Sequence, residues 1–232
     1  MRHNRLMRLL RHLPNALTCC NLLCGCIGII FTFSYSTQSG AWFVWAACVF
    51  DFLDGFAARL LKASSPIGKE LDSLADVVSF GVLPGMVMFQ MINTISPSNI
   101  LPYTAFVLTI FSALRLAKFN IDTRQSDSFI GLPTPANALF ITALPFLTSP
   151  WDIFISWDYF LVAIAVTFSF LLVAPFELFA LKLKNFQWAS NRVQFTFIAV
   201  AVLLLAVGQA SAMPFVILLY ILTSLLKNWL RI

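Results

Sequence analysis

The stretch DFLDGFAARLLKASSPIGKELDSLAD, residues 51–76, contains four acids that constrain how this chain can fold. Asp51 and Asp54 end one strongly apolar run and, at about 100° per residue, lie on one face of a helix. Asp72 and Asp76 open the next apolar run and, four residues apart, also share a helix face. The Ser-Ser-Pro-Ile-Gly break between the two runs predicts a turn. A helix hairpin would therefore bring both aspartate pairs together.

Four carboxylates at such close range would repel one another unless cations neutralised them. Together they form an all-oxygen site of the kind that suits Mg²⁺ or Mn²⁺. Two such ions could bridge a phosphate or pyrophosphate group. Gly55 and Ala58 share the helix face of the first pair and leave room for a ligand, and Arg59 on the same face could pair with phosphate. We therefore predict a divalent-metal site that binds a phosphate-containing ligand.

The whole chain is far more apolar than a soluble domain. Of its 232 residues, 59% are hydrophobic and only 11% are charged, and the mean hydropathy is +0.86. Soluble domains carry about 25% charged residues. The composition therefore excludes a water-soluble globule, a disordered chain and a disulfide scaffold, and it indicates an integral membrane protein. In a membrane protein, a net charge of +5 is explained by the orientation of the chain in the membrane and by contact with lipid headgroups. No nucleic-acid partner is therefore expected.

The apolar segments predict an all-α, polytopic transmembrane helix bundle of about eight spans. The chain is expected to form one domain over residues 1–232, with a catalytic helix pair at 41–92. A spanning helix needs about 20 residues, and the fifth and seventh segments are short by this measure. The eight segments are 16–35, 41–58, 71–92, 100–117, 134–149, 158–180, 194–209 and 213–230.

All 15 basic residues fall on one side of this eight-span arrangement. By the positive-inside rule, both termini and the aspartates then face the cytoplasm. Residues 1–15 form a basic leader with an arginine at every third position, which predicts an amphipathic helix on the membrane surface. We expect the protein to lie in the cell's inner, cytoplasmic membrane.

The spacing of the acids also carries a resemblance. Written out, it is Asp51-x2-Asp54-Gly55-x2-Ala58-Arg59-x8-Gly68-x3-Asp72-x3-Asp76, which resembles the signature of the CDP-alcohol phosphatidyltransferase family at every fixed position. The resemblance implies transfer of a phosphatidyl group from a CDP-lipid to an alcohol, with release of CMP and with Mg²⁺ or Mn²⁺ as cofactor. It also implies that Asp51, Asp54 and Asp72 hold one ion, that Asp51, Asp72 and Asp76 hold a second, and that Asp76 acts as the general base.

The same resemblance implies a set of contacts to the CDP-lipid, some of them in the residues that lead into the first span. These residues are Asn15, Thr18, Gly55, Ala58, Arg59, Ser65 and Gly68. Three further stretches, residues 76–84, 115–120 and 129–136, are similar to the serine-specific members of the family. The expected substrates are therefore CDP-diacylglycerol and L-serine, and the expected products are phosphatidylserine and CMP. A homodimer in contact with membrane lipids is expected on the same grounds.

An acceptor amino acid needs partners for its charged groups. Arg115 and Lys118, three residues apart near the end of the fourth span, share a helix face. We expect them to bind the serine carboxylate or a lipid phosphate, with Asn120 as a further polar contact. Lys118 stands where an arginine is usual in the family, so bidentate pairing is lost there. Ordinary anchoring by basic residues is an equally good interpretation of both cations.

Two alternatives stay open from the sequence. The same chemistry could use another acceptor alcohol, such as glycerol phosphate, inositol phosphate or choline. A cation-coupled transporter would also place carboxylates inside a membrane. Transporters often have repeated halves and broken helices at mid-membrane, and the sequence has no visible internal repeat.

Overall fold

The structure is a computed structural model that describes residues 11–97, 100–121, 128–179 and 191–230. Most of these residues are helical. The α-helices are α2 (Leu13–Ser34), α3 (Thr37–Leu60), α4 (Pro66–Asp76), α5 (Leu83–Ile95), α6 (Phe106–Ile121), α7 (Thr134–Ala143), α8 (Asp152–Ile155), α9 (Asp158–Val173), α10 (Arg192–Gly208) and α11 (Met213–Leu230). Shorter helical turns are η1 (Val77–Val82), η2 (Leu101–Ala105), η3 (Leu144–Phe146) and η5 (Gln209–Ala212).

Several of these helices are suited to a membrane. Within the described ranges, five helical stretches are long and apolar enough to cross one: Leu13–Ser34, Thr37–Leu60, Pro66–Ile95, Leu101–Ile121 and Arg192–Trp229. Helix α9 is apolar but shorter. These stretches support an integral membrane protein with a predominantly helical fold. Each of the eight predicted segments contains a helix, but the number of spans stays a prediction. Most of the predicted amphipathic leader, residues 1–10, lies outside the described residues.

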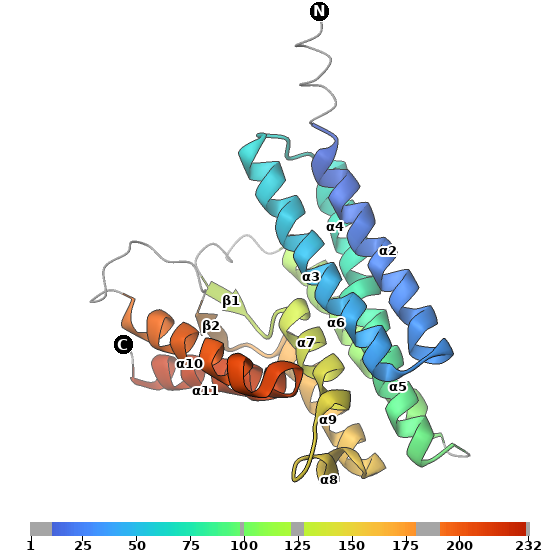
Figure 1. Cartoon of the computed structure of the whole chain (residues 1–232). Coiled ribbons are helices and arrows are strands. Elements are labelled where there is room, and N and C mark those ends of the chain that lie inside the picture. Colours follow the sequence, from blue (N-terminus) through green and yellow to red (C-terminus); the bar gives the residue numbers. More distant parts are fainter. Residues whose placement is uncertain (1–10, 98–99, 122–127, 180–190, 231–232) are drawn as a thin grey trace, which may run out of the picture.

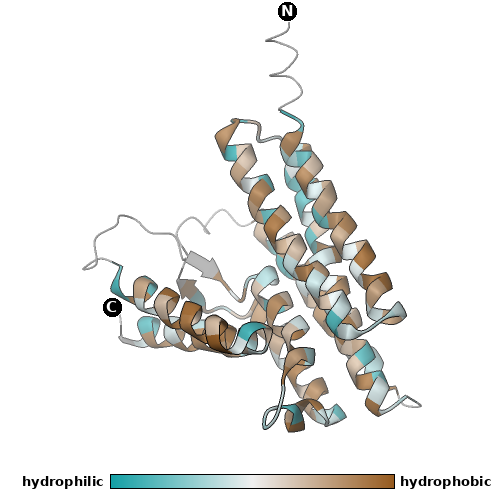
Figure 2. Ribbon diagram, in the orientation of Figure 1, coloured by the Kyte–Doolittle hydropathy of each residue, from teal (hydrophilic) through white to brown (hydrophobic). Residues whose placement is uncertain are grey.

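Helices α2 to α6 lie side by side and form one bundle (Figure 1). Helices α7 and α9 pack against this bundle, and in the same view α10 and α11 run across its direction. Along most helices the ribbon is coloured as hydrophobic or intermediate (Figure 2). Large apolar side chains such as Ile30, Phe52, Leu74 and Val202 are exposed on the outside. Exposed apolar side chains on so many helices are what lipid contact requires.

Helices α2 and α3 form a closely packed hairpin. Ser36 caps α3, because its hydroxyl accepts a hydrogen bond from the backbone N–H of Ser39 at 3.0 Å. Near this turn, Gly40 faces Thr32 and the carbonyl oxygen of Gly28 across the hairpin. A β-carbon at position 40 would lie 2.9 Å from that carbonyl oxygen and would also overlap the hydroxyl of Thr32. Glycine is therefore what lets the two backbones approach here.

Gly40→Ala is expected to destabilise the protein by about 1–3 kcal/mol, because the added methyl group must push the two helices apart. A thermal unfolding curve in detergent measures the change. Gly55→Ala is the matched control, since a β-carbon at position 55 meets no neighbouring atom within 4 Å in the part of the chain that the structure describes. Equal unfolding temperatures for the two variants would contradict the close approach at Gly40.

Helix α4 begins at Pro66, directly after the predicted turn. Ser65 caps it by accepting a hydrogen bond from the backbone N–H of Gly68 at 3.1 Å, and Pro66 suits the first helical position. The helix continues without a break through η1, a short π-helical stretch, into α5, giving one rod over Pro66–Ile95. The cap fixes where the rod begins, and thereby the faces on which Asp72 and Asp76 lie.

One predicted boundary differs from the structure. The apolar segment 158–180 was expected to be a single span, but α9 ends at Val173. Pro175 lies two residues beyond this end. Ala174, between Val173 and Pro175, has an extended backbone, which a residue preceding proline prefers. Strand β2 (Glu177–Phe179) then pairs antiparallel with β1 (Ser128–Ile130) in a short ribbon that was not predicted from the sequence.

This ribbon sets the entry into α7. The backbone N–H groups of Gly131 and Leu132 donate to the carbonyl oxygens of Phe176 and Leu171 at 2.9 and 2.8 Å. Gly131 has φ +76°, in the left-handed region, and a β-carbon there would overlap the carbonyl oxygen of Leu172. The turn therefore requires glycine, and it directs the chain from β1 into the buried helix α7.

Candidate active site

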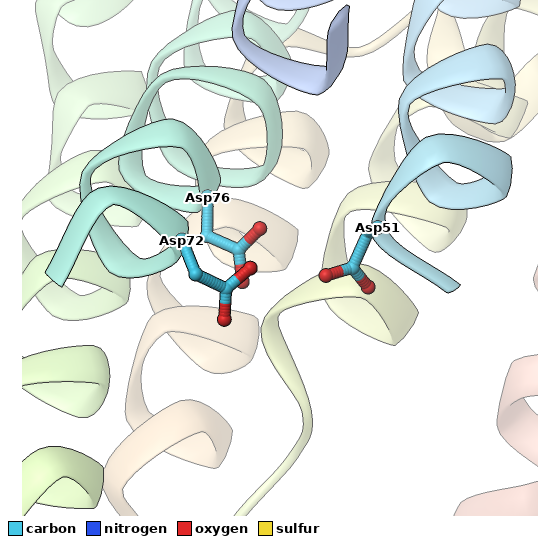
Figure 3. A group of neighbouring side chains, drawn as sticks. All are labelled: Asp51, Asp72 and Asp76. Atoms are coloured by element: carbon cyan, nitrogen blue, oxygen red, sulfur yellow. The ribbon is translucent and has the colours of Figure 1, made fainter. Parts of the chain in front are cut away.

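Three aspartates meet between α3 and α4. Asp51 projects from α3, and Asp72 and Asp76 project toward it from α4 (Figure 3). One carboxylate oxygen from each lies within 4.8 Å of the other two. Asp76 is the most enclosed of the three, with 7% of its surface exposed. The predicted meeting of the two aspartate pairs is thus realised for Asp51, Asp72 and Asp76, which we call the acidic triad.

A neighbouring helix holds the deepest member of the triad. The side-chain amide of Asn21, on α2, donates to Oδ1 of Asp76 at 3.1 Å, and Asn21 itself is fully buried. The hydroxyl of Ser79 in turn donates to the backbone carbonyl of Asn21 at 2.9 Å. Asn21 is a residue of the site that was not predicted from the sequence. The available signal was a polar amide inside an otherwise apolar span, which marks a functional or buried contact.

Asp54 has a different environment from the triad. Its Oδ2 accepts a short hydrogen bond, 2.6 Å, from the hydroxyl of Thr18 on α2, and only 4% of its surface is exposed. Asp54 borders the cavity described below together with Asp72. Asp54 and Asp72 thus line one cavity. Asp54 is not, however, one of the three aspartates whose carboxylate oxygens lie within 4.8 Å of one another.

A cavity of about 560 Å³ opens beside the triad, between the start of α2, the end of α3 and the start of α4. Six of the seven residues predicted to contact the CDP-lipid line it, and they do so together with Asp54 and Asp72. The lining residues are Pro14, Asn15, Thr18, Asp54, Gly55, Ala58, Ala63, Ser64, Ser65, Pro66, Gly68, Lys69 and Asp72. Arg59, the seventh, is exposed, and its Nε donates to the carbonyl oxygen of Gly55 in its own helix at 3.0 Å.

The two glycines of the motif have different surroundings. Among the described residues, no atom outside its own helix backbone comes within 4 Å of a β-carbon built at Gly55, so the backbone there faces open space in the cavity. A β-carbon at Gly68 would lie 3.0 Å from Oδ1 of Asn15 and 3.0 Å from Oγ of Ser65. Gly55 therefore leaves room for a ligand, and Gly68 leaves room for its neighbouring polar side chains.

The three residues predicted to bind serine or phosphate are placed very differently. Arg115 is buried, with 7% of its surface exposed, and lies close enough to Asp76 for electrostatic attraction. Lys118 is exposed. The amide of Asn120 donates to the hydroxyl of Ser73 at 2.8 Å, and its backbone carbonyl accepts from Nζ of Lys69 at 2.9 Å. Asn120 thus ties the end of α6 to α4.

The triad has the donor set that a hard divalent cation needs. Its ligands are all carboxylate oxygens, which Mg²⁺ and Mn²⁺ prefer. Oδ1 of Asp72 is buried without a hydrogen-bond partner among the described residues, so it is available to a cation. Three carboxylates this close to one another repel strongly without a positive charge between them. The geometry and the chemistry of the triad therefore both fit a metal ion.

Comparison with known proteins agrees with this arrangement. The sequence profile of a family described as CDP-alcohol phosphatidyltransferase matches residues 11–171, which include the triad, the cavity and Arg115. The match therefore covers most of the chain, from the start of α2 almost to the end of α9.

Three relatives named CDP-diacylglycerol–serine O-phosphatidyltransferase illustrate the similarity. The chain is 40% identical over 130 residues to that of Helicobacter pylori strain J99, covering 55% of this chain and 54% of the relative. It is 36% identical over 142 residues to that of Bacillus subtilis, covering 61% and 79%. It is 37% identical over 124 residues to that of Methanocaldococcus jannaschii, covering 53% and 55%. The matched region thus spans about half the length of the first and third.

Proposed function

Because the chain belongs to the CDP-alcohol phosphatidyltransferase family, we propose that it transfers the phosphatidyl group of CDP-diacylglycerol to the hydroxyl of L-serine. The products are phosphatidylserine and CMP. The observation that carries the proposal is the acidic triad at the edge of a cavity large enough for a nucleotide. The names of the relatives support serine as the acceptor.

The donor lipid is assigned to the cavity. Asn15, Thr18 and Ser65 offer polar groups to the cytidine and ribose, and Gly55 and Ala58 let the diphosphate approach the backbone of α3. Gly68 leaves room for the side chains of Asn15 and Ser65 to lie close to α4. Arg59, exposed at the same end of α3, can swing toward the diphosphate, since it is held only by a hydrogen bond to its own helix.

The acidic residues supply the remaining parts of the site. Asp51, Asp54, Asp72 and Asp76 are the proposed ligands of one or two Mg²⁺ or Mn²⁺ ions. Such ions, when bound, neutralise the diphosphate oxygens and stabilise CMP as the leaving group. Two of the proposed ligands are oriented by hydrogen bonds from α2, since Asn21 donates to Asp76 and Thr18 donates to Asp54.

The proposed reaction is a direct displacement. The serine hydroxyl attacks the phosphorus that bears the diacylglycerol, and Asp76 accepts the hydroxyl proton as general base. A new bond forms between the serine oxygen and phosphorus as the bond from that phosphorus to the CMP oxygen breaks. Arg115, buried near Asp76, is the proposed partner of the serine carboxylate, while the exposed Lys118 suits a lipid phosphate. Asn120 is a further polar contact at this end of α6.

The membrane arrangement is part of the same proposal. Eight spans within a single domain would place both termini and the triad at the cytoplasmic face of the inner membrane, with the basic leader on its surface. The one-sided distribution of basic residues supports this orientation. Serine and CMP then exchange with the cytoplasm, and the acyl chains stay in lipid. A homodimer is proposed on the family resemblance.

The cavity assignment makes a prediction about Gly55. Gly55→Leu is expected to raise the KM for CDP-diacylglycerol by about ten- to a hundred-fold, because its side chain fills space that the donor needs. Steady-state kinetics in mixed micelles measure the change. Val49→Leu, which enlarges an exposed side chain on the same helix, is the control. An unchanged KM in Gly55→Leu would place the donor elsewhere.

The proposed function is tested with purified protein, CDP-diacylglycerol and Mn²⁺ or Mg²⁺. Release of CMP is measured with L-serine, glycerol phosphate, inositol phosphate or choline as the acceptor, and the lipid product is identified by mass spectrometry. We expect CMP and phosphatidylserine in equal amounts with L-serine alone. CMP release that depends on another alcohol would retain the chemistry but replace the acceptor. No CMP with any acceptor would overturn the proposed function.

A further inference from the structure

A second group of buried polar atoms lies outside the cavity, where α6 meets α7. Nη1 of Arg115 donates to the hydroxyl of Thr134 at 3.4 Å, but its Nε has no hydrogen-bond partner within the part of the chain that the structure describes. Asn137 is fully buried, and in the same described ranges neither its amide nitrogen nor its amide oxygen is paired. The cavity beside the triad is not lined by any of these three residues.

Unpaired polar groups of this kind are rare and costly. More than about 90% of buried polar groups in proteins have a hydrogen-bond partner, and an unpaired one costs about 1–3 kcal/mol. Asn137 could be replaced by an apolar residue of similar size at no loss of internal hydrogen bonds. Its presence one helical turn from Thr134, which contacts an incompletely paired arginine, is explained if both Asn137 and Arg115 bind a ligand.

The position of these residues identifies the kind of ligand. Thr134 and Asn137 are three residues apart and share one face of α7, and Thr134 contacts Arg115. Helix α7 packs against α3, which carries Asp51, and against η1, which follows Asp76. Arg115 also lies within the range of electrostatic attraction of Asp76. A ligand held here lies next to the proposed base, on the α6–α7 side of the triad.

Resting on the proposed function, we propose that Asn137 and Arg115 bind the amino-acid end of the acceptor and make Asn137 a specificity-determining residue. The guanidinium pairs with the carboxylate, a geometry in which two parallel hydrogen bonds form. The Asn137 amide complements it, because its oxygen accepts from the ammonium group and its nitrogen donates to the carboxylate. An acceptor without a carboxylate, such as ethanolamine, leaves the Arg115 guanidinium and the Asn137 amide nitrogen unpaired, and such a site rejects it strongly.

The test compares Asn137→Ala and Asn137→Asp with the wild-type protein in the CMP-release assay, varying serine and CDP-diacylglycerol separately. Loss of one or two hydrogen bonds is expected to raise the KM for serine about tenfold in Asn137→Ala. In Asn137→Asp the rise is expected to be larger, because the new carboxylate repels that of serine. The KM for CDP-diacylglycerol is expected to stay within about twofold in both variants. The preference for serine over ethanolamine should fall in Asn137→Ala.

Thr142→Val is the matched control. Thr142 is also buried on α7, but its hydroxyl is already satisfied by the carbonyl oxygen of Ala138 at 2.7 Å. Its kinetics are expected to be unchanged. Thermal unfolding in detergent checks folding, and Asn137→Ala is expected to be at least as stable as the wild type because it removes an unpaired amide.

The outcomes separate this inference from the proposed function. A wild-type protein that releases no CMP with serine overturns the proposed function itself. If the wild-type protein is active and both Asn137 variants keep its KM for serine and its acceptor preference, only the role of Asn137 is overturned. Equal increases in the KM for both substrates, or unfolding of both variants, would also overturn it, because they indicate a structural role.

Discussion

Replacing Asp76 by asparagine is expected to reduce CMP release by about 10²–10⁴-fold, the range that a positioned general base contributes. Asparagine keeps the shape of the side chain, and its oxygen can still accept the hydrogen bond from Asn21. The change therefore removes the proton acceptor and one negative charge of the triad without opening a hole in the packing. Loss of turnover with a normal unfolding temperature is the expected signature.

Single-turnover measurement of CMP formation at saturating serine and CDP-diacylglycerol tests this expectation. Asp152→Asn is the matched control, because Asp152 is an exposed aspartate at the start of α8 and does not belong to the acidic triad. It should keep wild-type turnover. If Asp76→Asn kept more than a tenth of the wild-type rate, Asp76 could not be the base of the reaction.

Removal of divalent cations is expected to have an effect of similar size. Metal coordination contributes several kcal/mol of charge stabilisation, so dialysis against a chelator should lower the rate at least about 10²-fold. Addition of Mg²⁺ or Mn²⁺ should restore it. The reason lies in the triad, whose three carboxylates have oxygens within 4.8 Å of one another and supply the ligands.

Mn²⁺ binding can be followed directly by electron paramagnetic resonance, independently of turnover. The wild-type protein should bind Mn²⁺, and Asp51→Asn should bind it far more weakly, since one side of the triad is lost. Asp152→Asn again serves as the control and should bind normally. Full activity in the presence of a chelator, or Mn²⁺ binding that is unaffected in Asp51→Asn, would remove the triad from the metal site.

The parts of the site that could be predicted from sequence are those set by local geometry. Helix periodicity places Asp72 and Asp76 on one face, and the Ser-Pro break predicts the hairpin that brings Asp51 opposite to them. The difference between Asp54 and the triad could not be predicted in this way. It depends on the rotation of α3 about its own axis and on Thr18 from α2, and a single helix pattern contains neither.

Tertiary packing also decided which polar residues face the site. Arg115 and Lys118 share a helix face by spacing, yet one is buried near Asp76 and the other is exposed, because the end of α6 emerges from the bundle. Asn137 could not be selected from sequence, since its unpaired state appears only when α7 is packed. The end of α9 at Val173 was missed for a related reason. The apolar run continues past it, and although Pro175 ends the helix, strand β2 beyond it forms only by pairing with a distant strand.

The π-helical stretch η1 restricts how this chain can vary over evolutionary time. In η1 the N–H of Leu83 bonds to the carbonyl oxygen of Val78, five residues back rather than four, so the stretch holds more residues than an α-helix of equal length. Gain of one codon in this stretch would turn α5 by about 100° relative to the acids just before it. Natural variation between Asp76 and Leu83 should therefore consist of replacements rather than insertions.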